Sequence, residues 1–258
     1  MGTFLFDKII FGPVSSRRLG VSLGINLLPA NAKWCSFNCI YCECGFNTNN
    51  GEKPVLPSRE EVKNQLLEYL TKNQKSEKKL TSITFAGNGE PSLHPDFDKI
   101  INDTIDLRNR LAPGVKIAVL SNATRIHKPE VFEALRKVDE NILKLDSASD
   151  NTVRLLNCPT GDFDLQNLIR HLKLFDGKLI IQTMFVKGEY KAQFVDNSTD
   201  EEIKAWLKII LDIKPEKVMV YTIARDTAAT GLCKVPAERL DYIASLVQKA
   251  GIQVMVSY

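Results

Sequence analysis

The stretch TSITFAGNGEP, residues 81–91, passes from an apolar run that favours a β-strand into a turn rich in glycine, asparagine and glutamate. Similar β-rich runs precede and follow it: LGVSLGINLLP at 19–29, VKIAVLS at 115–121, NILKLD at 141–146, KLIIQTMFV at 178–186, EKVMVYTIA at 216–224 and GIQVMVSY at 251–258. Amphipathic segments separate these runs. Apolar strands that alternate with helices indicate a parallel sheet covered by helices.

Three of the amphipathic segments carry clear helix signals, and we expect helices over 58–74, 198–213 and 236–251. The first begins with Ser58 and has Glu61 at the position that completes a capping box. The second begins at Thr199 or Asp200, both of which are good N-cap residues. The third ends in Gly251, a residue type that commonly terminates helices.

The number and spacing of the strands favour a barrel over a small open sheet. A closed eight-unit barrel takes about 250 residues, and this chain of 258 residues must also hold an N-terminal strand and a long loop. We therefore predict an α/β fold, a partial (open) parallel β/α barrel of the TIM-barrel type with about six to seven strands. We expect residues 1–258 to form a single domain.

The amino-acid composition limits the classes of protein to which this chain can belong. Hydrophobic residues make up 44% and charged residues 25%, which is typical of a globular chain. The sequence has no long uncharged apolar run, and Asp7 and Lys8 interrupt the N-terminal segment where a signal peptide would need an apolar core. We therefore expect a cytoplasmic protein without a membrane partner. The formal charge of +3 is too small to indicate a nucleic-acid partner.

The loop KWCSFNCIYCECG, residues 33–45, holds four of the six cysteines. In a reducing compartment, clustered cysteines are more often metal ligands or redox groups than disulfides. Cys35, Cys39 and Cys42 have the spacing C-x-x-x-C-x-x-C, which can bring three thiolates around one centre. Three thiolates on a four-iron cluster leave one iron open to an exogenous ligand, which implies chemistry at that iron.

Zinc is the alternative occupant of this loop. A structural zinc site needs four ligands, and Cys44 could supply the fourth sulfur. Its spacing of one residue from Cys42 is awkward for closing the same site. A non-catalytic, zinc-stabilised binding protein that uses Cys35, Cys39, Cys42 and Cys44 therefore stays open as an alternative function.

The segment CSFNCIYC, residues 35–42, resembles the cluster motif of the radical S-adenosylmethionine (radical SAM) enzymes, in which an aromatic residue precedes the third cysteine as Tyr41 does. The segment AGNGEP, residues 86–91, resembles the Gly-Gly-Glu motif of the same superfamily, with Asn88 inserted between Gly87 and Gly89. The opening at 11–29 and the C-terminal part of the chain resemble a subgroup related to the wyosine-synthase-type radical enzymes.

The resemblance implies a [4Fe-4S] cluster on Cys35, Cys39 and Cys42, and S-adenosyl-L-methionine as the second cofactor. It implies reductive cleavage of S-adenosylmethionine to a 5′-deoxyadenosyl radical, which abstracts hydrogen from an unidentified substrate. Such an enzyme needs a reducing partner such as flavodoxin or ferredoxin. The substrate class stays open among a tRNA base, a partner protein and a small molecule.

The same resemblance assigns roles at the cofactor site. Glu90 would meet the amino group of the methionine part, and the residues beside it, Gly87, Asn88 and Gly89, would let backbone approach closely. The other expected cofactor-binding residues are Ser121 and Asn122 toward the carboxylate or ribose, Asp146 toward the ribose, Gln182 toward ribose or substrate, and Tyr41 beside the adenine.

Residues outside these motifs carry weaker signals. Cys158 and Cys233 are isolated in the sequence, so we expect one cluster only. Arg17, Arg18, Lys187 and Arg225 lie near predicted strand ends and could bind an anionic substrate. Solvation or ion pairing is the simpler interpretation of each.

Overall fold

The structure is a computed structural model, and it describes residues 4–48, 54–74 and 79–258. Its centre is an eight-stranded sheet with the order β1-β2-β3-β4-β5-β6-β9-β11. The strands are β1 (Ile10–Ser16), β2 (Gly20–Ile25), β3 (Ser82–Phe85), β4 (Lys116–Ser121), β5 (Glu140–Lys144), β6 (Ile180–Met184), β9 (Lys217–Tyr221) and β11 (Gln253–Ser257). All neighbours from β2 to β11 pair in parallel.

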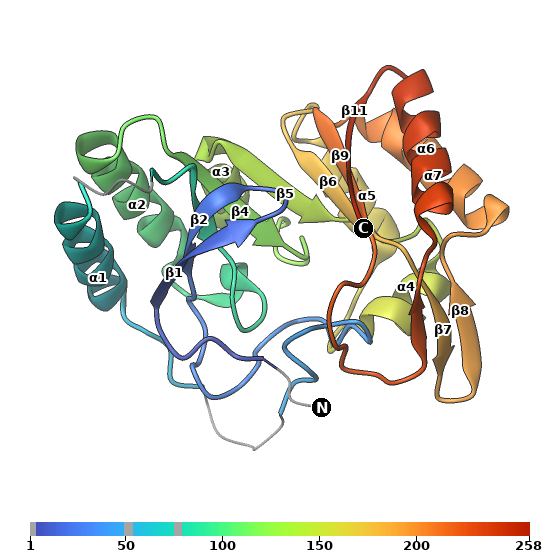
Figure 1. Cartoon of the computed structure of the whole chain (residues 1–258), viewed down its shortest axis with the longest axis horizontal. Coiled ribbons are helices and arrows are strands. Elements are labelled where there is room, and N and C mark those ends of the chain that lie inside the picture. Colours follow the sequence, from blue (N-terminus) through green and yellow to red (C-terminus); the bar gives the residue numbers. More distant parts are fainter. Residues whose placement is uncertain (1–3, 49–53, 75–78) are drawn as a thin grey trace.

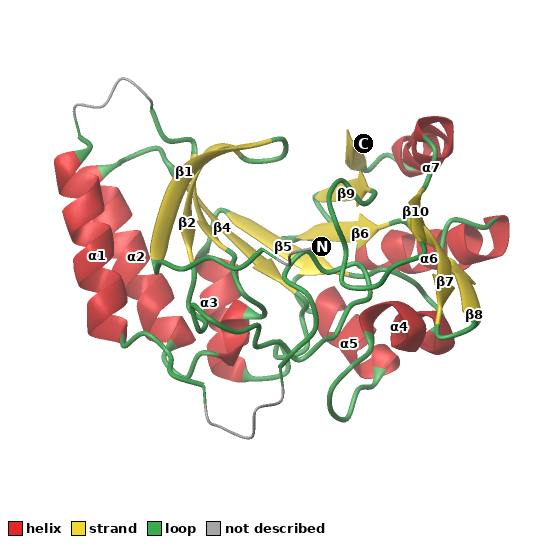
Figure 2. Ribbon diagram, turned by 60° about the horizontal axis from the view of Figure 1, so that its bottom comes forward, coloured by secondary structure: helices red, strands yellow, loops and turns green. Residues whose placement is uncertain are grey.

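The sheet curls but does not close, because β1 and β11 lie at its two edges and do not pair with each other (Figure 1). Helices cover its outer face (Figure 2). They are α1 (Arg59–Lys72), α2 (Phe97–Leu111), α3 (Pro129–Lys137), α4 (Asp150–Asn157), α5 (Leu165–Lys173), α6 (Asp200–Ile213) and α7 (Ala237–Lys249). The predicted partial parallel barrel is confirmed, and each of the seven predicted strand runs overlaps one of the strands from β2 to β11 in its sheet.

Two features of the sheets were not predicted. Strand β1 pairs with β2 in an antiparallel hairpin, although its sequence IFGPVSS contains a Gly-Pro pair that normally signals a turn. Proline is tolerated there because β1 is an edge strand. A second sheet of three strands, β7 (Val186–Tyr190), β8 (Gln193–Asp196) and β10 (Leu232–Lys234), has the order β10-β7-β8. The predicted run at 178–186 is therefore divided between β6 and β7.

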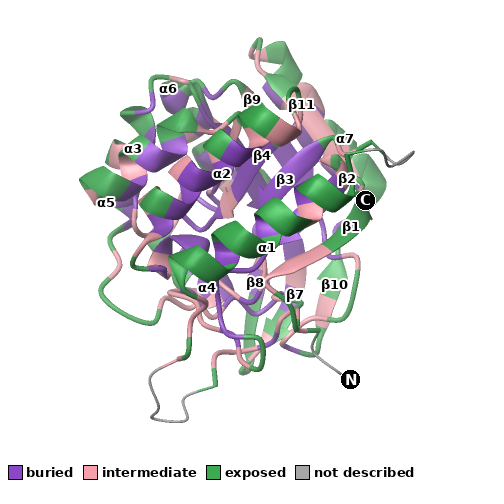
Figure 3. Ribbon diagram, turned by 90° about the vertical axis from the view of Figure 1, so that its left-hand side faces the viewer, coloured by how far each residue is buried: buried purple, intermediate pink, exposed green. Residues whose placement is uncertain are grey.

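The main hydrophobic core lies between the sheet and the helices. Figure 3 shows buried residues on the strands and on the inner side of the helices, with exposed residues on their outer side. Side chains such as Phe85, Phe97 and Trp206 are almost completely buried in this layer. A smaller apolar cluster around Phe37, Ile40 and Leu156 packs the cysteine loop against the rest of the protein.

The predicted helix caps are present. Ser58 and Glu61 form a reciprocal capping box at the start of α1, and Thr199 caps α6. Helix α7 ends at Lys249, and Gly251 follows its C-cap with a φ of +79°. Gly251 therefore occupies the left-handed position that terminates many helices.

Replacing Ser58 by alanine is expected to lower the free energy of unfolding by about 1 kcal/mol, because the first turn of α1 loses its side-chain acceptor. Urea unfolding measures this change. Ser245→Ala is a suitable control, since the exposed Ser245 hydroxyl bonds only to the carbonyl of Tyr242 within α7. Equal losses in the two variants would contradict a specific role for the cap.

Candidate active site

The carboxyl ends of the strands and the cysteine loop enclose one pocket of about 270 Å³. Chemistry usually gathers at this edge of a parallel barrel. The pocket brings together most of the residues that the sequence singled out: Cys35, Cys39, Cys42, Tyr41, Gly87, Gly89, Glu90, Ser121, Asn122 and Gln182. Asn88 and Asp146 do not line it.

One side of the cysteine loop is fixed to the turn after β3. The Trp34 amide donates to the Asn88 carbonyl at 2.8 Å, and the Glu90 amide donates to the Trp34 carbonyl at 3.2 Å. Gly89 has a φ of +140°, and a Cβ atom built on it would lie 1.9 Å from the Trp34 carbonyl oxygen. Only glycine allows this close approach of the two backbones.

Asn88, which separates the two glycines, points away from the pocket. Its side chain is completely buried, and its Nδ2 donates to the carbonyls of Phe6 and Pro29 at 2.8 and 2.7 Å. Its Oδ1 accepts from the Phe6 amide at 2.8 Å. Asn88 therefore ties the turn to the N-terminal segment, and only its backbone is close to the cysteine loop.

The other side of the loop rests on the end of α4. The Asn38 amide donates to the carbonyl of Asn157, and the Ile40 amide donates to the carbonyl of Leu156, each at 2.9 Å. These carbonyls belong to the last turn of the helix, where intrahelical donors are missing. The loop satisfies them, so helix α4 and the cysteine loop hold each other in place.

The cysteines of the pocket lie in an environment of mixed charge. Burial raises the pKa of the Cys35 and Cys39 thiols. A hydrogen bond with the Cys44 thiol, assisted by the nearby Lys33 ammonium, lowers the pKa of Cys42 to about 6 against the opposing effect of burial. Lys33 is itself buried and donates to the Gly45 carbonyl at 2.9 Å.

The chemistry of these donors fits an iron–sulfur cluster. Three thiols face one pocket, and the Lys33 ammonium can offset the negative charge of thiolates. The amides of Asn122 and Asn157 also approach the sulfurs of Cys35 and Cys39, each at 3.5 Å. In residues 4–48, 54–74 and 79–258, no group of three or more His, Cys, Asp or Glu side chains is itself arranged to hold a metal ion.

Glu90 is almost completely buried at the wall of the pocket. Its Oε1 accepts from the Ser92 amide, the Ser92 hydroxyl and the Ser121 hydroxyl at 3.1, 2.5 and 2.8 Å, and its Oε2 accepts from the Asn122 amide at 2.6 Å. Burial raises the pKa of the carboxyl against the effect of these bonds. A carboxylate has about four acceptor positions, so Oε2 keeps capacity for one more donor.

Ser121 and Asn122 connect Glu90 to the cysteine loop. Besides its contact with Glu90, Asn122 donates from Nδ2 to the Ser36 hydroxyl at 2.9 Å. Its Oδ1 accepts from the Thr124 amide and hydroxyl at 3.0 and 2.8 Å. The end of β4 therefore orients the carboxylate and the first cysteine segment together.

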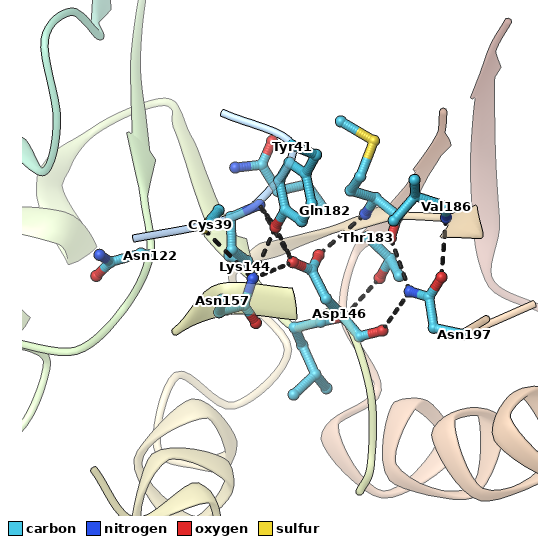
Figure 4. A network of polar contacts seen from close by, with 12 residues as sticks. Cys39, Tyr41, Asn122, Lys144, Asp146, Asn157, Gln182, Thr183, Val186 and Asn197 are labelled. Atoms are coloured by element: carbon cyan, nitrogen blue, oxygen red, sulfur yellow. Dashed lines mark hydrogen bonds and ion pairs between the residues drawn. The ribbon is translucent and has the colours of Figure 1, made fainter. Parts of the chain in front are cut away.

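Asp146 lies at the centre of a buried polar network below the pocket (Figure 4). Its Oδ2 accepts from the Tyr41 hydroxyl and from Asn157 Nδ2, and lies 3.5 Å from Lys144 Nζ. Its Oδ1 accepts from the Met184 amide at 3.0 Å. Both oxygens are thus engaged by the protein, and a contact with a cofactor ribose would require Asp146 to exchange one of these partners.

Lys144 also belongs to the site, although it lies in no recognisable motif. Its Nζ donates to the hydroxyls of Tyr41 and Tyr221 at 3.1 and 3.4 Å, in addition to its ion pair with Asp146. Burial alone would lower the pKa of Lys144, but Asp146 and the other nearby acidic groups raise it. Period-two alternation along the run 141–146 was an available signal, because an extended segment places residues 144 and 146 on one face.

A curled parallel half-barrel with clustered cysteines at its carboxyl edge places the chain in the class of α/β barrels that carry their site at this edge. The family model of the radical SAM superfamily matches residues 32–199. The chain belongs to the radical SAM superfamily and is an enzyme of this class.

Two curated relatives align over most of this chain. A Brachyspira hyodysenteriae protein described as GTPase Obg is 32% identical over 87% of this chain and 31% of its own length. A Helicobacter pylori UPF0026 protein is 30% identical over 85% of this chain and 68% of its own length. This chain thus spans less than a third of the first relative and about two thirds of the second.

Solved structures share the fold. Streptococcus suis SuiB bound to S-adenosylmethionine has a TM-score of 0.63 at 18% identity, over 91% of this chain and 50% of SuiB. Archaeal TYW1, a wyosine synthase, has a TM-score of 0.51 at 13% identity, over 89% of this chain and 72% of TYW1. Among the described residues, no helix is long and apolar enough to cross a membrane.

Proposed function

We propose that this chain holds a [4Fe-4S] cluster through Cys35, Cys39 and Cys42 and binds S-adenosylmethionine in the pocket beside it. The bound cofactors would supply reductive cleavage to methionine and a 5′-deoxyadenosyl radical, which takes a hydrogen atom from the substrate. One electron must enter from an external donor such as flavodoxin or ferredoxin. The observation that carries the proposal is that the three cysteines and Glu90 line the same pocket.

The protein groups of the pocket suit the two ends of this cofactor. The free acceptor position on Glu90 Oε2 would take an ammonium proton, and charge-assisted hydrogen bonds of this kind are strong. Ser121, Ser92 and the Asn122 amide hold the carboxylate so that it does not have to reorganise. The substrate stays a proposal among a tRNA base, a partner protein and a small molecule.

Cys44 separates this proposal from the zinc alternative. Its thiol lies 3.5 Å from the Gly87 carbonyl and bonds to the Cys42 thiol, whereas the pocket is lined by the other three cysteines of the loop. The three-ligand cluster therefore predicts that Cys44 is dispensable. A four-ligand zinc site requires it.

The test is anaerobic iron–sulfide reconstitution, followed by reduction with dithionite in the presence of S-adenosylmethionine and chromatographic assay of 5′-deoxyadenosine. We expect Cys39→Ser to lose the cluster and to form about a hundredfold less 5′-deoxyadenosine, or lower still. Even substitution of residues that only hydrogen-bond to metal ligands lowers metal affinity or activity by about 10–100-fold. Cys44→Ser should retain both. Equal loss in the two variants, together with tightly bound zinc in the parent protein, would overturn the proposal in favour of the zinc site.

A further inference from the structure

The inner face of the curled sheet is built in layers. Ala118, Ile142, Ile180 and Met219 form an apolar layer, and Leu19 from the tip of the β1–β2 hairpin packs against it. Side chains two residues further along the same strands point to the same side of the sheet. These are Leu120, Lys144, Gln182 and Tyr221, and all four line the pocket.

Arg18 precedes Leu19 at the hairpin tip, and its side chain joins this second layer. Its Nη1 donates to Gln182 Oε1 at 3.2 Å, and its guanidinium lies 4.7 Å from the centre of the Tyr221 ring. The Ser16 hydroxyl accepts from the amides of Arg18 and Leu19, which fixes the turn. Arg18 is therefore a half-buried cation held by a neutral amide and an aromatic ring.

Arg18 differs from the other cations of the pocket because it has no anionic partner among the described residues. Lys144 is paired with Asp146, and Lys33 lies beside the cysteine thiols. Within the described residues, no carboxylate forms an ion pair with Arg18. Only one of its five N–H donors has a side-chain partner there. A guanidinium that lines a pocket and keeps most of its donors available among the described residues can bind an anionic ligand there.

We propose that Arg18 binds an anionic group, a carboxylate or a phosphate, on the substrate of this enzyme. The planar guanidinium can receive either group in bidentate form. Gln182 and Tyr221 orient it toward the pocket, while Leu19 anchors the hairpin tip that carries it. This inference rests on the proposed function only in identifying the ligand as the substrate, because binding of an anion needs no turnover.

The experiment is calorimetric titration of the reconstituted protein with inorganic phosphate and with acetate, each in the presence of excess S-adenosylmethionine. Acetamide is the neutral counterpart of acetate. We expect at least one anion to bind and acetamide not to bind. Arg18→Ala should lower the affinity for the anion by about tenfold or more, which is the amount expected for a charge-assisted hydrogen bond. Phosphate binding without acetate binding, or the reverse, identifies the group.

Arg17→Ala is the matched control. Arg17 is the exposed neighbour of Arg18, donates to the Tyr258 carbonyl and does not line the pocket. The Arg17→Ala variant should bind the anion with the same affinity as the parent protein. Absence of binding by both anions, or equal weakening in the two variants, would overturn the inference. The same titrations are repeated without S-adenosylmethionine. An anion that binds only in its absence would also overturn the inference, since the cofactor carboxylate would then be the partner. Formation of 5′-deoxyadenosine by the parent protein tests the proposed function separately.

Discussion

Gly89→Ala is expected to destabilise the protein by about 2–6 kcal/mol and to prevent assembly of the cluster. The new Cβ atom would lie 1.9 Å from the Trp34 carbonyl oxygen, so one backbone must move. Overpacking of this kind costs about 1–3 kcal/mol, and a side chain at such a positive φ adds a further 1–3 kcal/mol. The movement would also break the hydrogen bonds that join Trp34 to Asn88 and to Glu90.

Gly114→Ala provides the matched control for this substitution. Gly114 also has a positive φ, of +88°, but a Cβ atom built there meets nothing within 4 Å. The Gly114→Ala substitution should lower the free energy of unfolding only by the backbone strain, about 1–2 kcal/mol. Urea unfolding and the absorbance of the reconstituted protein measure both effects. If Gly89→Ala costs no more than Gly114→Ala and still binds iron normally, then close contact between the turn and the cysteine loop is not required.

The parallel half-barrel could be predicted because its strands are short apolar runs separated by amphipathic segments, a pattern that local sequence displays. The hairpin strand β1 could not be predicted, because Gly12 and Pro13 are typical of a turn. Most of its residues are exposed, so its sequence shows no alternation of apolar and polar residues that would indicate a strand. Strand β10, with the sequence LCK, is too short to show any period. Its pairing with β7 depends on tertiary contacts.

The candidate site was predictable to the extent that its residues follow strand ends. Glu90 and Ser121 come from consecutive parallel strands, whose carboxyl ends must share one edge. Lys33 and Asn157 carry no such signal, because their roles depend on how the cysteine loop and helix α4 fold back onto the site. Arg18 lies near a predicted strand end, but the sequence does not distinguish it from Arg17, Lys187 and Arg225. Asn157 is the last residue of α4, and it contacts Asp146 because this helix folds back beside the end of β5.

Asp146→Asn is expected to lower the free energy of unfolding by about 3–5 kcal/mol, because it leaves the buried Lys144 ammonium without its carboxylate. The side chains of Lys144 and Asp146 are 12% and 0% exposed, so water can replace the lost partner only in part. The exposed pair of Lys173 and Asp212, with side chains 43% and 55% exposed, is the control. Asp212→Asn should change stability by no more than about 0.5 kcal/mol.

A double-mutant cycle with Lys144→Met tests whether the charge pair is the cause. Lys144→Met alone should cost less than Asp146→Asn, because Tyr41, Asn157 and the Met184 amide still donate to Asp146. In the double variant neither charge remains, so part of the loss should be recovered, with a coupling energy of about 1–3 kcal/mol. Urea unfolding of the four proteins gives this energy. Additive losses would show that Asp146 stabilises the fold through its neutral hydrogen bonds instead, and that the Lys144 ammonium does not depend on it.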